Sequence, residues 1–185
     1  MNVYDFDNTI YKGDSTAHFY FFCLKRHPSM IKYIPSLAAG FAGYYIFKKG
    51  DKTHFKEKMY RFLKCIDLEK DVNDFWDKHI SNVKGWYLKQ QKPDDVIISA
   101  SSVFLLTPIC QKLGIKYLIA SPVDKKTGKY NGLNCHGEEK VRRFYEEFPN
   151  GKIDEFYSDS KSDTPLALIA KKAYLVKGNI ISDWK

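Results

Sequence analysis

The sequence has few features of a protein that is stabilised by a structural metal, secreted or inserted in a membrane. Its four cysteines show no Cys-x-x-Cys spacing, and Cys135-His136 has no second ligand pair at the spacing of a zinc site. We therefore expect free thiols in a reducing cytosol. The chain also lacks internal repeats, low-complexity tracts and flexible linkers. An acidic segment that begins at Asp5 leaves no room for a signal peptide ahead of it, so we expect a cytoplasmic protein.

No apolar run is clearly long enough to cross a bilayer. The best candidate, residues 31–47, reaches about 17 residues, which is the lower limit for a spanning helix. It also contains Lys32 and Pro35. We expect a helix that is buried against its neighbours and no transmembrane span. Peripheral contact of this helix face with a membrane surface is the alternative.

The composition is that of a globular chain with an excess of positive charge. Hydrophobic residues make up 44% and aromatic residues 16% of the 185 residues, which is ample for a core. The length favours one domain, or one domain with an inserted module. The formal charge of +8 indicates either an acidic partner, such as nucleic acid, a membrane surface or a phosphorylated substrate, or a solvated surface rich in lysine.

Short apolar runs alternate with helical patterns over much of the chain. Runs typical of buried strands occur at residues 2–6, 96–99, 115–120, 153–158 and 173–176. Helical patterns occur at 103–113, 138–148 and 165–172. This alternation predicts an α/β fold, with a Rossmann-like parallel sheet and helices on both faces. The turn chemistry of residues 124–129 predicts a small hairpin between 123 and 133.

Residues 14–85 do not follow this alternation. Prolines and Gly50 interrupt them, and apolar residues recur at helical steps of three and four. The clearest series is Met30, Ile34, Leu37, Ala38, Phe41, Ala42 and Tyr45. Further helices are expected at 51–65 and 69–80. The sequence therefore predicts a catalytic α/β core formed by residues 1–13 and 86–185, with an inserted all-helical unit at 14–85.

The pentapeptide Asp5-Phe6-Asp7-Asn8-Thr9 is the segment most suggestive of catalysis. Two carboxylates two residues apart at the end of a strand can divide the work of a nucleophile and an acid/base. In an extended segment they would point to opposite faces. The chain must therefore bend just after Asp5, which Asn8, Thr9 and a later glycine permit. Both carboxylates can then face one pocket.

Three further segments follow in an order that resembles a known family. They are Ser99-Ala100-Ser101 at a strand end, Gly137-Glu138-Glu139-Lys140-Val141, and Ser158-Asp159-Ser160-Lys161-Ser162-Asp163 at another strand end. With the pentapeptide, they resemble the four motifs of the haloacid dehalogenase-like hydrolases. The helical insertion and the Gly-x-x-Lys setting of Lys140 are similar to the phosphoserine phosphatase-like branch, in which the insertion is a cap over the active site.

The resemblance implies phosphatase chemistry through an aspartyl-phosphate intermediate. Asp5 would attack phosphorus, and Asp7 would protonate the leaving oxygen and later deprotonate water. Other matching groups would hold the phosphoryl oxygens. These are the side chains of Ser99 and Lys140, the backbone N–H groups around Asn8 and Ala100, and Thr9 of the opening motif.

A magnesium ion is expected at the same site. Asp5, Ser99 and Asp159 each end a separate strand, and ligands bind beyond the carboxyl ends of the strands of such a sheet. Crowded acids repel one another and need a cation, and hard oxygen ligands without His or Cys favour Mg²⁺. The expected ligands are the carboxylates of Asp5 and Asp159, the backbone carbonyl of Asp7, and waters.

Asp163, the second acid of the last motif, has two interpretations. As part of the metal site, it would orient Lys140 and a metal-bound water without binding the ion directly. It also precedes Thr164-Pro165, which is typical of a helix N-cap. Taken alone, Ser99 could likewise cap a helix, and Lys140 could be one of many surface lysines.

The substrate indicated by the resemblance is a small phosphorylated metabolite. Members of the branch that act on phosphoserine carry a Glu shortly after the first motif and an Arg in the cap. Here Asp14 stands near the first position, and no residue clearly matches that Arg. Lys58 and Arg61, three residues apart on an expected helix, are the pair that we expect to point into the pocket and bind substrate.

Two other functions are compatible with the sequence. A non-catalytic phosphate- or membrane-surface-binding protein on the same scaffold would account for the positive charge and the aromatic insertion, but it need not retain the nucleophile and the metal acids. A nucleic-acid end phosphatase is a rival among the enzymes. Nucleic acid is a less favoured partner, because no nucleic-acid-binding motif is recognisable and the insertion would exclude a bulky duplex.

Overall fold

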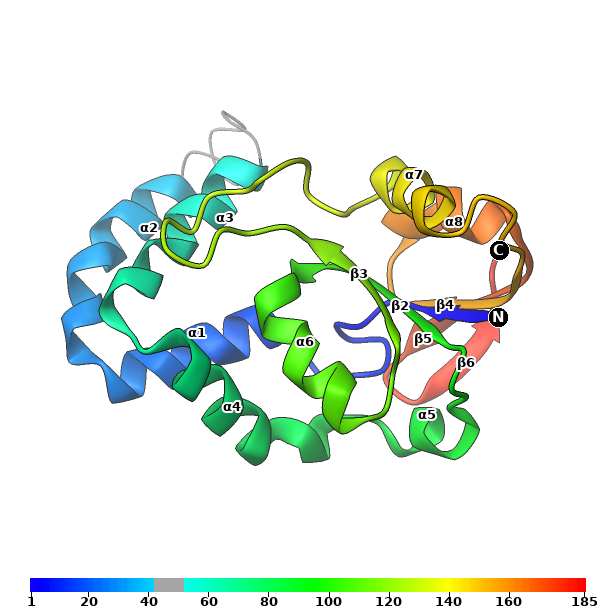
Figure 1. Cartoon of the computed structure of the whole chain (residues 1–185), viewed down its shortest axis with the longest axis horizontal. Coiled ribbons are helices and arrows are strands. Elements are labelled where there is room, and N and C mark those ends of the chain that lie inside the picture. The colour runs from blue at the N-terminus through cyan, green and yellow to red at the C-terminus, as the bar shows by residue number, and fades with distance from the viewer. Residues whose placement is uncertain (42–51) are drawn as a thin grey trace.

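In the computed structural model, which describes residues 1–41 and 52–185, a six-stranded sheet organises the fold (Figure 1). Its strands are β1 (Asn2–Tyr4), β2 (Val96–Ser102), β3 (Tyr117–Ser121), β4 (Ile153–Ser158), β5 (Ala170–Lys177) and β6 (Ile180–Asp183). The order across the sheet is β3-β2-β1-β4-β5-β6. All neighbours are parallel except β5 and β6. The expected Rossmann-like sheet is confirmed, and β6 is an edge strand that the sequence analysis did not predict.

The strand order reverses at β1, which has β2 on one side and β4 on the other. Ligands bind in such sheets beyond the carboxyl ends of the strands, at the point where the order reverses. Tyr4 at the end of β1 pairs with Tyr157 near the end of β4. Asp5 and Asp159 therefore leave neighbouring strands at the same edge of the sheet.

Helices cover both faces of this sheet. Those that follow β2 are α6 (Val103–Lys112), α7 (Glu138–Glu147) and α8 (Thr164–Leu168). Figure 1 shows α7 and α8 on one side, and α5 (Gly85–Gln90) on the other. Successive residues of a strand point to opposite faces. Accordingly, Val3 joins a core cluster with Phe144 of α7, whereas Tyr4 joins a second cluster with Tyr87 of α5.

The regular elements that the structure describes between β1 and β2 are helices. They form α1 (Ser15–Arg26), α2 (Ile34–Phe41), α3 (Lys52–Tyr60), α4 (Leu68–His79) and α5, with 3-10 turns at Pro28–Tyr33, Arg61–Cys65 and Ile80–Asn82. Tyr11 and Val83 pair as an isolated antiparallel bridge near the two crossings between this segment and the sheet. The division into a core of 1–13 and 86–185 and a cap of 14–85 stays a prediction.

Buried aromatic packing joins these helices to the core. Trp76 of α4 is fully buried, and its Nε1–H donates to the carbonyl of Leu105 in α6 at 2.6 Å. Its ring meets that of Phe6 edge-on, with the centroids 5.8 Å apart. Since Phe6 lies between Asp5 and Asp7, the turn that carries these acids rests directly on α4.

Within the described residues, no helix is long and apolar enough to cross a membrane. Helix α2 ends at Phe41. Ala42, Tyr45 and the remainder of the apolar stretch 31–47 lie outside the described residues, as do Gly50 and residue 51. Contact of this stretch with a membrane surface stays a prediction. All four cysteines belong to the described part of the chain and are free.

Two expected helices end earlier than the sequence pattern predicted. The helix predicted at 165–172 stops at Leu168, and β5 begins at Ala170. The helix predicted at 51–65 ends as α3 at Tyr60 and continues as a 3-10 turn. The expected hairpin is confirmed by the bridge between Val123 and Tyr130. Short apolar runs fit more than one backbone period, so periodicity alone cannot fix such ends.

Candidate active site

The segment after β1 turns sharply and brings two carboxylates to one pocket. The N–H of Ile10 donates to the carbonyl of Phe6 at 3.1 Å, which closes the turn. Asn8 has a φ of 57°, in the left-handed region that Asn tolerates better than most residues. The predicted bend is confirmed. Asp5 and Asp7 both line a pocket of about 690 Å³.

Lys140 is a buried cation in contact with two acids of the pocket, Asp5 and Asp163. Its Nζ donates to Oδ1 of Asp5 at 2.7 Å and to Oδ2 of Asp163 at 2.8 Å, and the residue is only 1% exposed. Thr9 Oγ1 donates to the other oxygen of Asp5 at 3.1 Å. Ser158 Oγ donates to Asp163 at 2.7 Å. Hydrogen bonds therefore fix the orientation of the Asp5 carboxylate through both of its oxygens.

Lys140 reaches this position from the first turn of α7. Gly137 precedes the helix with φ 59° and ψ −128°, a conformation that is costly for a residue with a Cβ. Glu139 accepts a bond from Arg143 Nε at 2.7 Å, and Arg143 also donates to the carbonyl of Ala120 in β3 at 2.8 Å. These contacts anchor the start of α7 against the sheet and place Lys140 over Asp5.

Burial and the neighbouring lysine have opposite effects on Asp5. Desolvation raises the pKa of Asp5 to about 7, even though the ammonium group of Lys140 lowers it. Burial by itself would lower the pKa of Lys140, but the carboxylates of Asp5 and Asp163 hold that pKa above its ordinary value. Lys140 therefore stays charged, and it favours the ionised form of Asp5 that a nucleophile requires.

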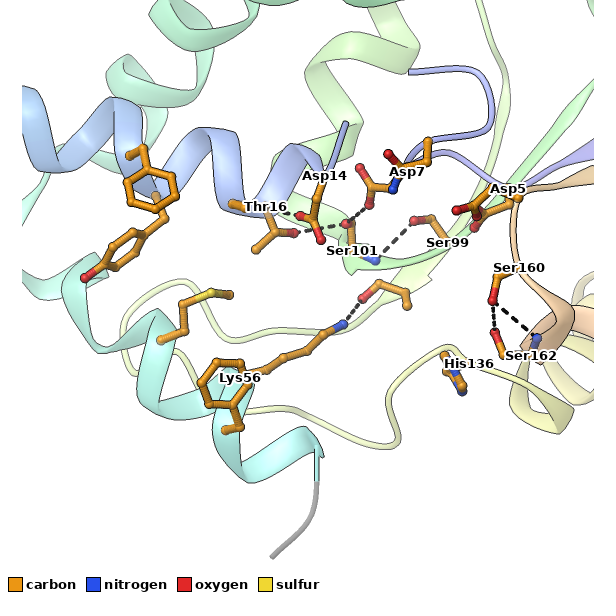
Figure 2. A pocket seen from close by; sticks show the side chains of 18 of the residues that line it. Asp5, Asp7, Asp14, Thr16, Lys56, Ser99, Ser101, His136, Ser160 and Ser162 are labelled. Atoms are coloured by element: carbon orange, nitrogen blue, oxygen red, sulfur yellow. Dashed lines mark hydrogen bonds between the residues drawn. The ribbon is translucent and has the colours of Figure 1, made fainter. Parts of the chain in front are cut away.

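Asp7 accepts hydrogen bonds from the start of α1 and from the end of β2. The N–H of Ser15 donates to Oδ1 at 2.6 Å, and Ser101 Oγ donates to Oδ2 at 2.5 Å. Thr16 Oγ1 lies 3.0 Å from Ser101 Oγ (Figure 2). Burial and the charge of Asp14 raise the pKa of Asp7 to about 6, although these hydrogen bonds lower it. A carboxyl group that titrates near neutral pH is suited to acid/base catalysis.

The end of β2 contributes Ser99 and Ala100. Ser99 is 1% exposed and lines the pocket, and its Oγ accepts a bond from the N–H of Ser101 at 3.1 Å. The carbonyl of Ala100 accepts a bond from Lys56 Nζ at 2.9 Å. Figure 2 shows Lys56 extending from α3 toward this strand end. Lys56 also donates to Asn134 Oδ1 at 3.2 Å, so it links α3 to the core.

Asp159, which lines the same pocket, is a second acid that could hold a metal ion together with Asp5. Its N–H donates to Thr9 Oγ1 at 2.9 Å, and the residue is half-buried and lines the pocket. Burial raises the pKa of Asp159, so a nearby cation would relieve the cost of its charge. With the backbone carbonyl of Asp7, the two carboxylates offer the hard oxygen atoms that Mg²⁺ prefers.

The protein oxygens at this site suit a metal ion that takes most of its ligands from water or from the substrate. In the part of the chain that the structure describes, no group of three or more His, Cys, Asp or Glu residues could hold a metal ion by itself. Mg²⁺ commonly binds through one or two carboxylates and keeps waters or substrate phosphate as its other ligands. Asp5 and Asp159 meet that requirement.

Asp163 contacts the buried lysine. Its Oδ2 is shared by Lys140 and Ser158. The contact with Lys140 supports the predicted role of Asp163 in orienting that lysine. Asp163 stands at the N-cap position of α8, but among the described residues its side chain is not seen to cap the helix.

Two residues expected to bind substrate do not line the pocket, which corrects that prediction. The side chain of Lys58 lies against Gly40 of α2. Arg61 Nη1 donates to Ser36 Oγ at 3.2 Å. Both side chains therefore lie against α2, whereas Phe55, Lys56 and Met59 are the residues of α3 that line the pocket.

The other predicted substrate-binding residues already have partners. Asn8 and Asp14 line the pocket. The N–H of Asn8 donates to the carbonyl of Gly13 at 3.0 Å, and Asp14 Oδ1 accepts from the N–H of Ala17 as the N-cap of α1. Thr9 is fully buried behind the strand-end acids and positions them, and it does not line the pocket.

Several polar residues of the pocket were not assigned to the site from the sequence. They are Thr16, Lys56, Ser101, His136, Ser160 and Ser162 (Figure 2). Alternation along a strand could have identified Ser101, since residues two apart share a face and Ser99 was already assigned to the site. Lys56, a third basic residue of the helix expected at 51–65, was set aside in favour of Lys58 and Arg61, and only the folded arrangement of α3 shows that it reaches β2.

Comparisons with known proteins agree with this geometry. The family model of the haloacid dehalogenase-like hydrolases matches residues 3–168. The chain is 27% identical over 114 residues to histidinol-phosphatase from Neisseria meningitidis serogroup C (strain 8013). That alignment covers 53% of the chain and 51% of the relative, so the chain spans about half the length of that relative.

Solved structures show the same fold at low sequence identity. A protein with unknown function from Bordetella pertussis Tohama I matches with a TM-score of 0.75 and 18% identity, over 94% of this chain and 87% of that one. A phosphoserine phosphohydrolase-like protein from Francisella tularensis subsp. tularensis SCHU S4 matches with a TM-score of 0.55 and 16% identity, over 94% and 86%. These likenesses show the architecture of the sheet and its helices.

Proposed function

The chain belongs to the haloacid dehalogenase-like hydrolases, and from this premise we propose that it is a Mg²⁺-dependent phosphatase that acts on a small organic phosphate monoester. The observation that carries the proposal is the contact of Lys140 with Asp5 at the point where the strand order reverses, in a pocket that Asp7 also lines. The phosphatase name of the aligned relative supports the same reaction class.

In the first step, a carboxylate oxygen of Asp5 attacks phosphorus. The bond between Asp5 and phosphorus forms while the bond from phosphorus to the ester oxygen breaks. Asp7 gives its proton to the departing oxygen, so that the product leaves as an alcohol. Lys140 and Ser99, which line the same pocket, bind the phosphoryl oxygens as their charge is redistributed.

In the second step, water hydrolyses the aspartyl phosphate. Asp7 is now ionised and takes a proton from the water, whose oxygen attacks phosphorus. The bond to Asp5 breaks, and inorganic phosphate and the original carboxylate are formed. Thr9 and Lys140 hold the two oxygens of Asp5 in place throughout the cycle.

Mg²⁺ would be held by the carboxylates of Asp5 and Asp159 and by the backbone carbonyl of Asp7. When bound, it would neutralise part of the negative charge shared by the phosphate and the acids. Asp163 would act on the lysine of the site and not on the ion.

Phosphoserine is not the substrate that this pocket favours. None of the arginines in the described chain lines it, so the carboxylate of phosphoserine has no guanidinium partner there. The substrate of histidinol-phosphatase is not transferred either, since the alignment covers only half of that protein. We therefore propose the hydrolysis of a phosphate monoester, and we assign neither phosphoserine nor histidinol phosphate as its substrate.

Phosphate release tests the proposal. Purified protein is assayed with small metabolite monoesters, an aryl phosphate and a 5′-phosphorylated oligonucleotide, with Mg²⁺ and with a chelator. We expect release from small monoesters that requires Mg²⁺ and is abolished in Asp5→Asn, which is nearly isosteric but cannot form the acyl phosphate. Release from the oligonucleotide alone would favour an end phosphatase. Phosphate binding without turnover of any ester would favour a non-catalytic scaffold.

A further inference from the structure

The pocket that holds the acids continues into a region of different chemistry. Its volume of about 690 Å³ exceeds what a phosphate group needs and lies in the range of sites for whole small molecules. Beyond the polar residues, its lining is aliphatic and aromatic. We call this region the apolar end and define it by Phe21, Leu24, Ile34, Leu37, Phe55 and Met59.

The apolar end is built from one face of each of three helices. Phe21 and Leu24 are three residues apart on α1. Ile34 and Leu37 repeat that step on α2. Phe55 and Met59 on α3 are four residues apart. Steps of three and four place side chains on a common helix face, so all three helices direct apolar groups toward the same space.

The basic side chains of Lys56, Lys58 and Arg61 do not offer a free charge to ligand groups at this end. Lys58 lies against Gly40, and Arg61 bonds to Ser36. Lys56 lines the pocket, but its ammonium group donates to Ala100 and Asn134 in the core. A substrate with a charged distal group would therefore lose its hydration at the apolar end without a compensating ion pair from these residues.

We propose that this site takes phosphate monoesters whose alcohol carries an aliphatic or aromatic chain, with the phosphate at Asp5 and the chain in the apolar end. The proposal deepens the phosphatase function above and rests on it for turnover, although binding can be measured separately. The substrate's apolar group would lie at the apolar end because one continuous cavity is lined by Asp5 and by the apolar residues.

A chain-length series tests this inference. Ethyl, butyl, hexyl and octyl phosphate are assayed as dissolved monomers, with O-phosphoserine for comparison. Burial of each methylene group should raise kcat/KM by up to about fourfold until the apolar end is filled. Octyl phosphate should therefore exceed ethyl phosphate by at least tenfold. Equal values across the series would overturn the proposal.

A matched pair of variants locates the effect. Phe21 lines the pocket and is 58% exposed, whereas Ile31 lies outside it and is 59% exposed. Phe21→Asp should lower kcat/KM for octyl phosphate several-fold and change that for ethyl phosphate little, while Ile31→Asp should leave both values unchanged. Because both side chains are largely exposed, neither change should unfold the protein. Equal effects of the two variants on octyl phosphate would contradict the assignment.

Binding separates this inference from the proposed function. Titration calorimetry with the non-hydrolysable ethyl and octyl phosphonates is carried out in the presence of Mg²⁺. Tighter binding of the octyl compound, lost in Phe21→Asp, supports the apolar end even if no ester is hydrolysed, in which case only the phosphatase proposal fails. Turnover of esters together with equal binding of the two phosphonates would overturn the apolar end and leave the phosphatase proposal intact.

Discussion

The hydroxyl of Ser101 lies 2.5 Å from Oδ2 of Asp7, although 94 residues separate the two in the chain. The contact joins the end of β2 to the turn after β1. Ser15, the first residue of α1, donates to the other oxygen of the same carboxylate. The proposed acid/base therefore contacts the first turn of α1 as well as the end of β2.

Removal of the Ser101 hydroxyl should make Asp7 harder to ionise. The hydroxyl lowers the pKa of Asp7, which burial raises to about 6. Ser101→Ala should therefore raise that pKa further, by about one unit for the loss of a hydrogen bond to a charged group. Asp7 must be ionised to accept a proton from water, so the acid limb of the pH–rate profile for an aryl phosphate should move to higher pH.

Thr16→Val is the control for this prediction. Thr16 Oγ1 contacts the hydroxyl of Ser101, which in turn donates to Asp7. Its removal should move the acid limb in the same direction, but by less than half as much. An unchanged limb in Ser101→Ala, or equal movements in both variants, would be inconsistent with Asp7 as the titrating base.

The two acids of the last motif should differ in their effect on Mg²⁺. Asp159→Ala removes an expected anionic ligand and should weaken Mg²⁺ binding at least tenfold, measured by titration calorimetry. Asp163→Asn removes a partner of Lys140 and should affect Mg²⁺ affinity less. If Asp163→Asn weakened Mg²⁺ binding more than Asp159→Ala did, the two roles would have to be exchanged.

Lys84 should position the turn that carries Asp5 and Asp7. Its Nζ donates to the carbonyls of Asn8 at 2.5 Å and Gly178 at 2.6 Å, and burial lowers the pKa of Lys84. Lys84→Met should lower kcat roughly tenfold by loosening the left-handed turn at Asn8, with a smaller change in KM. Lys89→Met, at an exposed position of α5, the helix that follows Lys84, is the control. Equal kcat values for the two variants would count against a positioning role.

Glu139 should stabilise the fold in a pH-dependent way. Hydrogen bonds from Arg142 and Arg143 hold the pKa of Glu139 at about 2, below its ordinary value of 4.5. A carboxyl group with a lowered folded-state pKa contributes stability above its unfolded pKa, and this contribution is lost as the pH falls toward the folded value. Glu139→Gln should therefore lower the free energy of unfolding by about 1 kcal/mol at pH 7. The difference should shrink between pH 4.5 and 2.

Urea unfolding of both proteins at pH 7 and pH 3 measures this difference. A deficit of the same size at both pH values would show that Glu139 acts through packing and not through its charge.

Much of the site could be predicted because the ends of buried strands can be located in the sequence. Asp5 and Asp159 each follow an apolar run, and the carboxyl ends of parallel strands meet at one edge of the sheet. The positions of the helices do not affect where these strand ends meet. The bend after Asp5 could also be predicted, since Asn8 tolerates the left-handed conformation that the structure shows.

The lining of the pocket's far end could not be predicted in the same way. It depends on how α1, α2 and α3 pack, and the helical period does not fix the rotation of one helix against another. Lys58 and Arg61 both lie against α2, whereas Lys56 of α3 donates to the end of β2. Strand β6 was missed because its residues are exposed and its pattern has no buried face.

Chemical trapping of the intermediate is the most direct test of the central claim, that Asp5 is the nucleophile. Protein with Mg²⁺ is mixed with a ³²P-labelled aryl phosphate, quenched in acid during turnover, digested and mapped by mass spectrometry. The account predicts phosphorylation of Asp5 in the wild-type protein, and neither label nor phosphate release in Asp5→Asn. Label on a different residue, or full turnover by Asp5→Asn, would contradict it.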